Sequence, residues 1–229
     1  MENQHGFISR YRYEIFFFSL FLVLFGSIFF PFGLYSNFIE PVIFLLNILA
    51  GAELLKQHVK LYRICLSIFV IALITNILER IVPETLGGDI ASKLRLFMYF
   101  FFYSVVTIQL ILQVWNAKEV SARAMLALMS GYICLGLVGF FIFSTIELFT
   151  PGSIGGIDPA QGVTDELMYF SYITLLTIGY GDISPVTPIA QRASILLGLV
   201  GQFYLVIIMA VVLEKFTRHK KKKKSELEL

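Results

Sequence analysis

The amino-acid sequence predicts an all-α membrane protein with six transmembrane helices and a re-entrant segment between the last two. Of its 229 residues, 57% are hydrophobic and only 15% are charged, whereas soluble domains carry about a quarter charged residues. Apolar runs of about eighteen residues or more recur along the chain, and this is the length that crosses a bilayer. Before the last of these runs, a helix too short to cross the membrane precedes a glycine-containing strand, which is typical of a re-entrant loop.

The six predicted spans follow one another with short polar connections. They cover residues 13–30, 37–55, 61–82, 94–115, 124–149 and 190–216. We expect two transmembrane domains, over residues 13–116 and 124–216. The remaining segments are a polar N-terminus (1–12), a linker (117–123) and a polybasic tail (217–229).

The distribution of basic residues predicts the orientation of the spans. Lys and Arg concentrate in the N-terminus, in the connector at 56–63, in the linker and in the tail. The loop at 31–37 and the turret, residues 150–163, contain neither. Because basic loops stay in the cytoplasm, both termini are expected there, and the turret is expected outside.

The re-entrant segment has two parts. Residues 165–176 form an amphipathic run of about three helical turns. Thr177-Ile178-Gly179-Tyr180-Gly181-Asp182, here called the filter segment, follows directly. Gly179 and Gly181 allow backbone conformations that other residues avoid, so successive carbonyl groups can point the same way.

The filter segment resembles the potassium-channel signature Thr-x-x-Thr-x-Gly-Tyr-Gly-Asp. The matching residues are Thr174, Thr177, Gly179, Tyr180, Gly181 and Asp182. The resemblance implies a voltage-gated-like ion channel architecture with a pore helix at 165–176 and a selectivity filter. In such filters, of which potassium channels are the established example, backbone carbonyls and a Thr hydroxyl replace the ion's hydration shell. K⁺ coordination is expected at Thr177, Ile178, Gly179, Tyr180 and Gly181, with K⁺ as the permeant ion and no cofactor.

One filter segment per chain predicts a homotetramer. A ring of carbonyls around an ion needs four such loops, and the sequence contains one copy and no internal repeat. The resemblance implies that the fifth and sixth spans line the pore.

Three residues are expected to support the filter: Asp182, Tyr169 and Glu147. Tyr169 occupies a place where the family often has Trp bonded to the Asp after the filter; the alternative is an ordinary aromatic residue at the membrane interface. Glu147, near the outer end of the fifth span, resembles the acidic residue that relatives use to tie this helix to the pore loop. A charge at that depth needs a partner.

The sixth span carries two candidate gating glycines. Gly201 falls where these channels usually have a hinge glycine, and Gly198 precedes it by nearly one turn. The alternative is close helix packing, for which small residues are preferred in membranes.

The fourth span lacks the charges of a voltage sensor, because residues 96–116 contain no charged side chain. Voltage sensing requires several gating charges, so little or no voltage dependence is expected. Polar residues within the first four spans, among them Asn47, Asn76, Gln109 and Gln113, indicate interhelical hydrogen bonds or, alternatively, a ligand cavity.

The tail is expected either to anchor the topology or to contact anionic lipids, through Arg218, Lys220, Lys221 and Lys222. Since only thirteen residues follow Phe216, no attached ligand-sensing domain is expected. Together these features predict a potassium-selective channel subunit that is not an enzyme, with no nucleic-acid partner, in a prokaryotic inner membrane. The alternatives are a weakly selective cation channel and a regulatory subunit that needs a partner chain.

Overall fold

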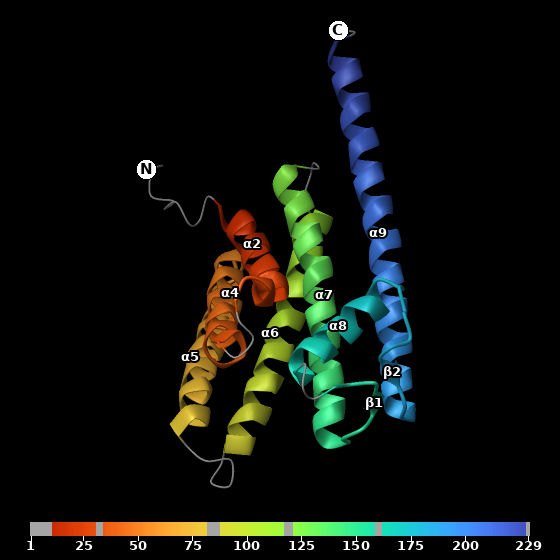
Figure 1. The fold of residues 1–229 in the computed structure, drawn as a ribbon. Coiled ribbons are helices and arrows are strands. Elements are labelled where there is room, and N and C mark those ends of the chain that lie inside the picture. The colour runs from red at the N-terminus through yellow and green to blue at the C-terminus, as the bar shows by residue number, and fades with distance from the viewer. Residues whose placement is uncertain (1–10, 31–33, 82–87, 117–120, 159–161, 228–229) are drawn as a thin grey trace. The chain divides into compact units, whose positions relative to one another are not determined.

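The computed structural model describes residues 11–30, 34–81, 88–116, 121–158 and 162–227 (Figure 1). The chain forms two compact units, Met1–Gln109 and Leu110–Leu229, with the boundary inside one long helix. In order, the elements are α2 (Arg12–Phe25), the 3₁₀ turn η1 (Gly26–Ile28), the π-helical turn η2 (Tyr35–Ile39), α4 (Glu40–Leu54), α5 (Val59–Ile81), α6 (Gly88–Asn116), α7 (Ala122–Phe149), β1 (Ile154–Gly155), α8 (Val163–Leu175), β2 (Ser184–Pro185) and α9 (Pro188–Leu227).

Each predicted span corresponds to a helix, but the helices differ in length. Four of the described helices are long and apolar enough to cross a membrane, over Val59–Leu78, Ile90–Asn116, Ala122–Phe149 and Pro188–Val211. The first two spans contain shorter α-helices of 14 and 15 residues, α2 and α4. The protein is therefore an integral membrane protein by its helices, and its number of crossings stays a prediction.

The predicted first span, 13–30, is too long at its C-terminal end. Regular α-helix stops at Phe25, and the chain tightens into η1 from Gly26. The Tyr35 ring packs against Gly26, where a Cβ would lie 2.8 Å from its Cε2 atom. This close approach and the low helix propensity of glycine explain the early end.

The last helix is longer than predicted. α9 begins at Pro188, a position where proline needs no hydrogen-bonded N–H, and continues through the tail to Leu227. The backbone of the tail is thus helical rather than extended. Arg218, Lys220, Lys221 and Lys222 lie outside the residues whose side chains the structure describes.

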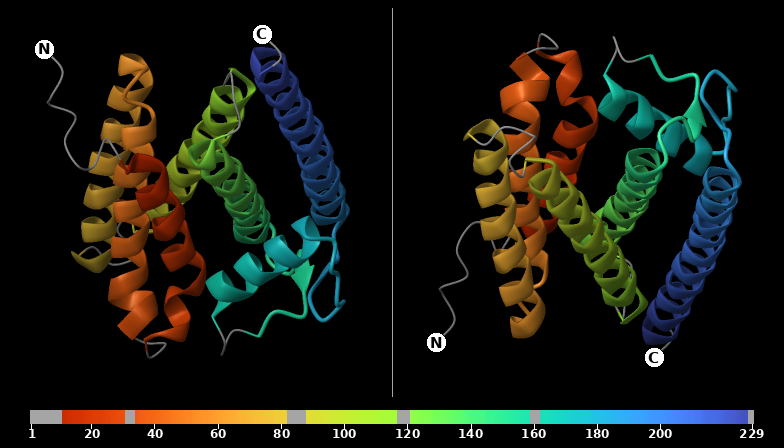
Figure 2. Two further views of the ribbon diagram at one scale, coloured as in Figure 1. Left: turned by 90° about the horizontal axis from the view of Figure 1, so that it is seen from above. Right: turned by 90° about the horizontal axis from the view of Figure 1, so that it is seen from below.

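In the first unit, α2 and α4 lie side by side (Figure 2) and pack around large apolar side chains. The fully buried ones include Phe16, Leu20, Ile48 and Phe102. Gly51 makes the close approach possible, because a Cβ there would lie 2.6 Å from Cζ of Phe102.

Buried asparagines hold this unit together through hydrogen bonds between helices. Asn47 is fully buried; its Nδ2 donates to Ser19 Oγ (2.8 Å), and its Oδ1 accepts from Tyr103 Oη (2.7 Å). Asn76 donates to Ala72 O within its own helix (2.7 Å), and its Oδ1 accepts from Arg95 Nη1 of α6 (3.4 Å). For these two residues the prediction of interhelical hydrogen bonds is confirmed. The side-chain amide of each already has a donor and an acceptor partner within the protein.

In the second unit, α8 lies obliquely between α7 and α9 (Figure 1) and packs against both. Three glycines of α7 form notches at these contacts: Gly131 faces Tyr204, Gly136 faces Tyr172, and Gly139 faces Ser171 and Leu197. Backbone carbonyls of α7 accept hydrogen bonds from the hydroxyl groups seated there. The bonds are Tyr204 to Leu128 (2.6 Å), Tyr172 to Ile133 (2.6 Å) and Ser171 to Gly136 (2.7 Å).

Replacing Asn47 with alanine is expected to reduce the free energy of unfolding by about 1–2 kcal/mol, because Ser19 and Tyr103 both lose a buried partner. The measurement is a denaturant titration of the purified protein in detergent micelles. Ser104→Ala is the matched control, since Ser104 bonds only within its own helix, to Phe100 O. Equal losses in the two variants would contradict the role assigned to Asn47.

Candidate ion-conducting segment

The backbone of the filter segment alternates in handedness. Thr177, Gly179 and Gly181 have positive φ angles of 58°, 57° and 84°. Among the described residues, Thr177 is the only non-glycine residue with a positive φ. This alternation is the conformation that allows successive carbonyl oxygens to face one side of the strand, as expected for Gly179 and Gly181.

The left-handed conformation of Thr177 could not be predicted from the sequence, because a β-branched residue rarely adopts it. It is held by backbone hydrogen bonds to the end of α8. Thr177 N donates to Thr174 O (3.1 Å), and Ile178 N donates to Ile173 O (2.9 Å). Such local strain persists only where surrounding contacts impose it, and it concentrates at functional sites.

The filter segment is largely uncovered within its own chain. Ile178 is 47% exposed and Tyr180 is 73% exposed. A Cβ added to Gly179 or Gly181 would have no neighbour within 4 Å. Two large apolar or aromatic side chains therefore lie beside open space in a single chain.

Tyr169 and Asp182 connect α8 to the end of the filter segment. Tyr169 Oη donates to Asp182 Oδ2 at 2.7 Å. This hydrogen bond lowers the pKa of Asp182 from its usual value and raises the pKa of Tyr169 to about 12. The tyrosine therefore keeps its proton at neutral pH, and the aspartate stays ionised to accept the bond.

Glu147 ties the end of α7 to the turret rather than directly to α8. Its carboxylate accepts from the backbone N–H groups of Gly152 (2.6 Å) and Ile154 (3.0 Å). Ile154 is also the first residue of β1, which pairs antiparallel with β2 so that Ile154 lies opposite Pro185. This small sheet was missed at the sequence level, because two-residue strands carry no periodic signal.

The turret thereby lies directly against the C-terminal end of the filter segment. Val186 N donates to Ser153 O at 2.8 Å. Gly156, with a φ of 89°, packs so closely that an added Cβ would collide with Asp182 O. The segment after Asp182 is thus fastened from two sides, by the turret and by Tyr169.

The two candidate hinge glycines have different surroundings. Gly201 is packed against the end of α8, where a Cβ would lie 2.6 Å from Leu175 Cδ1. Gly198 has nothing within 4 Å of such a Cβ. α9 runs through both positions as one helix. The contact of Gly201 is the close packing that the alternative interpretation predicts.

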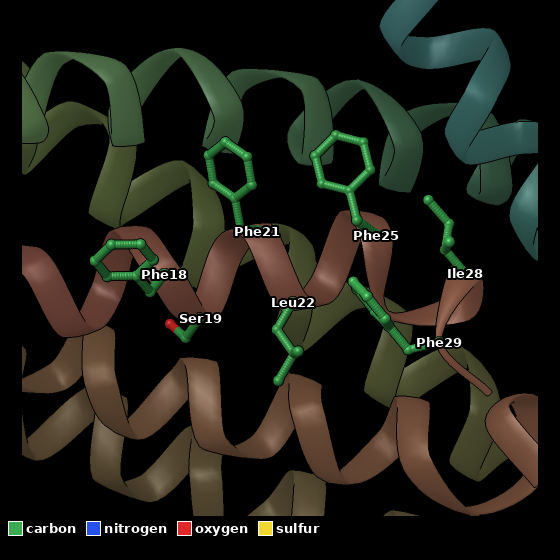
Figure 3. A pocket seen from close by; sticks show the side chains of 7 residues that line it. All are labelled: Phe18, Ser19, Phe21, Leu22, Phe25, Ile28 and Phe29. Carbon is green, nitrogen blue, oxygen red and sulfur yellow. The ribbon is translucent and has the colours of Figure 1, made fainter.

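An apolar groove of about 810 Å³ lies along α2 and η1 (Figure 3). It is lined by Phe18, Ser19, Phe21, Leu22, Phe25, Ile28 and Phe29. Its one polar group, the Ser19 hydroxyl, already donates to Phe16 O and accepts from Asn47. The groove therefore offers no ligand to an ion. Within the described part of the chain, no group of three or more His, Cys, Asp or Glu residues is placed to hold a metal.

Comparison with known proteins gives one family match, which lies in the second unit, and a short match to one relative. Residues 128–218 match the protein family described as ion channel. A protein from Oryza sativa subsp. japonica, "two pore potassium channel c", is 46% identical over 52 residues. That match covers 23% of this chain and 11% of the rice protein. No solved structure matches the chain significantly. These matches support a channel of the potassium-channel type, as the filter segment predicts.

Replacing Tyr169 with phenylalanine is expected to raise the pKa of Asp182 toward its ordinary value, because the hydrogen bond that favours the carboxylate is lost. In the native protein this bond stabilises the fold above the ordinary pKa of Asp, and the contribution is lost as pH falls through the lowered pKa. The measurement is an infrared titration of the carboxylate in ¹³C-labelled protein, with Asp182→Asn to identify its band. Tyr62→Phe, a change in the other unit, is the control. An Asp182 titration that is the same with and without the Tyr169 hydroxyl would refute this coupling.

Proposed function

We propose that the chain is a subunit of a potassium-selective channel that conducts K⁺ passively across the membrane. The observation that carries the proposal is the alternating backbone of the filter segment, with positive φ at Thr177, Gly179 and Gly181. This segment lies inside the region that matches the ion-channel family. Thr177, Ile178, Gly179, Tyr180 and Gly181 supply the oxygen ligands that replace the hydration shell of K⁺. The permeant ion is the only ligand required, and no reaction is catalysed.

The functional unit is a homotetramer in this proposal. A single chain supplies one quarter of each oxygen ring. The exposed side chains of Ile178 and Tyr180 support this arrangement, since neighbouring subunits would cover them. α7 and α9 then form the outer and inner helices around the pore.

The proposed support of the filter follows from its hydrogen bonds. Tyr169 braces Asp182 from α8, and Glu147 fixes the turret that lies against Asp182 O. Because these bonds act from outside the ion path, they keep the filter segment rigid without obstructing it. Rigidity matters, since carbonyls that relax around a smaller ion would also admit Na⁺.

The proposed orientation places both termini in the cytoplasm and Asp182 at the extracellular mouth, in accord with the basic loops and the Lys/Arg-free turret. The tail residues Arg218, Lys220, Lys221 and Lys222 then lie where anionic headgroups can attract them. α6 supports voltage independence. Within its apolar stretch Ile90–Asn116 the charged residues are Lys93 and Arg95, near one end, and the part from Leu96 to Asn116 has none.

The deciding experiment is the reversal potential of the purified protein in planar bilayers, with K⁺ on one side and Na⁺ on the other. A value near the K⁺ equilibrium potential, with conductance independent of voltage, is the expected result. A reversal near zero would make the protein a weakly selective cation channel. A reconstituted, correctly folded protein that carries no current would make it a subunit that needs a partner chain.

Two glycine variants distinguish a specific effect on the ion path from the strain that alanine causes at any position with a positive φ. Gly179 and Gly152 both have positive φ, and in both cases an added Cβ has open space around it. Alanine at either position therefore costs a similar strain, of about 1 kcal/mol. Gly179→Ala is expected to abolish K⁺ selectivity, whereas Gly152→Ala in the turret leaves the reversal potential unchanged. The same reversal potential in both variants would remove Gly179 from the ion path.

A further inference from the structure

One face of α9 is fixed to its own unit. The buried residues Ala190, Leu197, Gly201 and Tyr204 recur at spacings of seven, four and three, which places them on one side of the helix. At Gly201 the backbone of α9 lies against Leu175, at the end of α8. The carbonyl of Leu175 also accepts from Tyr132 Oη of α7 at 3.3 Å. Gly201 therefore lies at a contact to which α7, α8 and α9 all contribute.

Tyr204 makes the next contact, one turn further along α9. It is 8% exposed, and its hydroxyl donates to Leu128 O of α7 at 2.6 Å. Gly131 provides the notch for this hydroxyl, because a Cβ there would lie 2.6 Å from the Oη atom. The Tyr204 ring also contacts the Tyr132 ring, with centroids 5.5 Å apart. In an apolar environment this hydroxyl gains strongly from its partner, so the contact is a specific anchor.

Beyond Tyr204, α9 has no buried residue among those whose burial the structure describes. None of the described residues 205–211 is buried, and Met209 is 70% exposed. The opposite helix shows the same limit, since none of the described residues before Ala127 in α7 is buried. Among the described residues, the Tyr204–Leu128 bond is thus the last side-chain hydrogen bond from α9 to α7.

We propose that Tyr204 is a positioning residue that sets where the movable part of α9 begins, so that the helix bends after Tyr204 and not at Gly201. A bend at Gly201 would pull α9 away from Leu175 and break the Tyr204 bond. A bend after Tyr204 breaks neither contact. The inference deepens the proposed function, because a movable cytoplasmic half of α9 is the gate of the pore only if the chain is a channel.

The test measures distances inside one chain and needs no ion current. Spin labels are attached at Met129 of α7 and at one of three exposed positions of α9, Ile195, Phe203 or Met209. The background carries Cys65→Ala and Cys134→Ala, which removes both native thiols. Doubly labelled chains are diluted with unlabelled chains in bilayers, and distance distributions are recorded by pulsed electron paramagnetic resonance.

In this cysteine-free background, without further substitution, we expect narrow distance distributions for the label pairs 129–195 and 129–203. The distance distribution for the pair 129–209 is expected to be at least about two-fold wider. Tyr204→Phe removes the hydroxyl and is expected to widen the 129–203 distribution to a similar extent, because the last anchor then becomes the Gly201 contact. Tyr172→Phe is the matched control. It removes the same kind of bond to a carbonyl of α7, but from α8, and leaves the 129–203 distribution narrow.

Gly131→Ala provides a second variant that keeps the tyrosine. Its Cβ displaces the Tyr204 hydroxyl and is expected to widen the 129–203 distribution as Tyr204→Phe does. In a Tyr204→Phe background the same change has little further effect, because the displaced atom is already absent.

Three results would overturn the proposal: a native 129–203 distribution as wide as 129–209, a 129–209 distribution as narrow as 129–195, or a 129–203 distribution unaffected by Tyr204→Phe. Failure of the proposed function is a separate result, seen as absence of K⁺-selective current in planar bilayers while the distances behave as expected.

Discussion

The second unit depends on the close approach of hydroxyl side chains to the backbone of α7. Carbonyl groups in a helix already accept one bond from within the helix and have a second lone pair available. Glycines at 131, 136 and 139 expose this backbone, so the side chains of Tyr204, Tyr172 and Ser171 can reach it. Apolar burial alone gives little driving force between helices in lipid, so hydrogen bonds and small-residue packing set their positions. The same row of glycines on α7 therefore positions both α8 and α9.

The position of α8 in turn determines the conformation of the filter segment. Thr177 remains left-handed because its N–H and that of Ile178 are held by carbonyls at the end of α8. At the far end, Asp182 is held by Tyr169 and lies against the turret at Gly156. A strand restrained at both ends keeps a strained backbone that an isolated peptide would lose. Contacts far from any ion thereby shape the segment proposed to bind it.

The first unit has a different internal organisation. Its polar residues pair with one another across helices, as Asn47 does with Ser19 and Tyr103. Buried amides with satisfied hydrogen bonds specify the register of packed helices, since a shift along the axis would leave donors unpaired. This explains why polar residues occur within apolar segments that lack the charges of a voltage sensor.

The sequence by itself determined the membrane class, the order of the helices and the filter segment, because these follow from apolar run length and from a short motif whose residue types are dictated by chemistry. It also indicated that Tyr169, Glu147 and Gly201 matter, through their places around the motif. Their contacts were decided only by the tertiary structure: Glu147 binds the turret, Gly201 packs on Leu175, and Thr177 is left-handed. The same is true of the β1–β2 pair and of the Tyr204 anchor. These features join residues distant in the chain, and the period of a helix says which face a residue occupies but not which partner meets it.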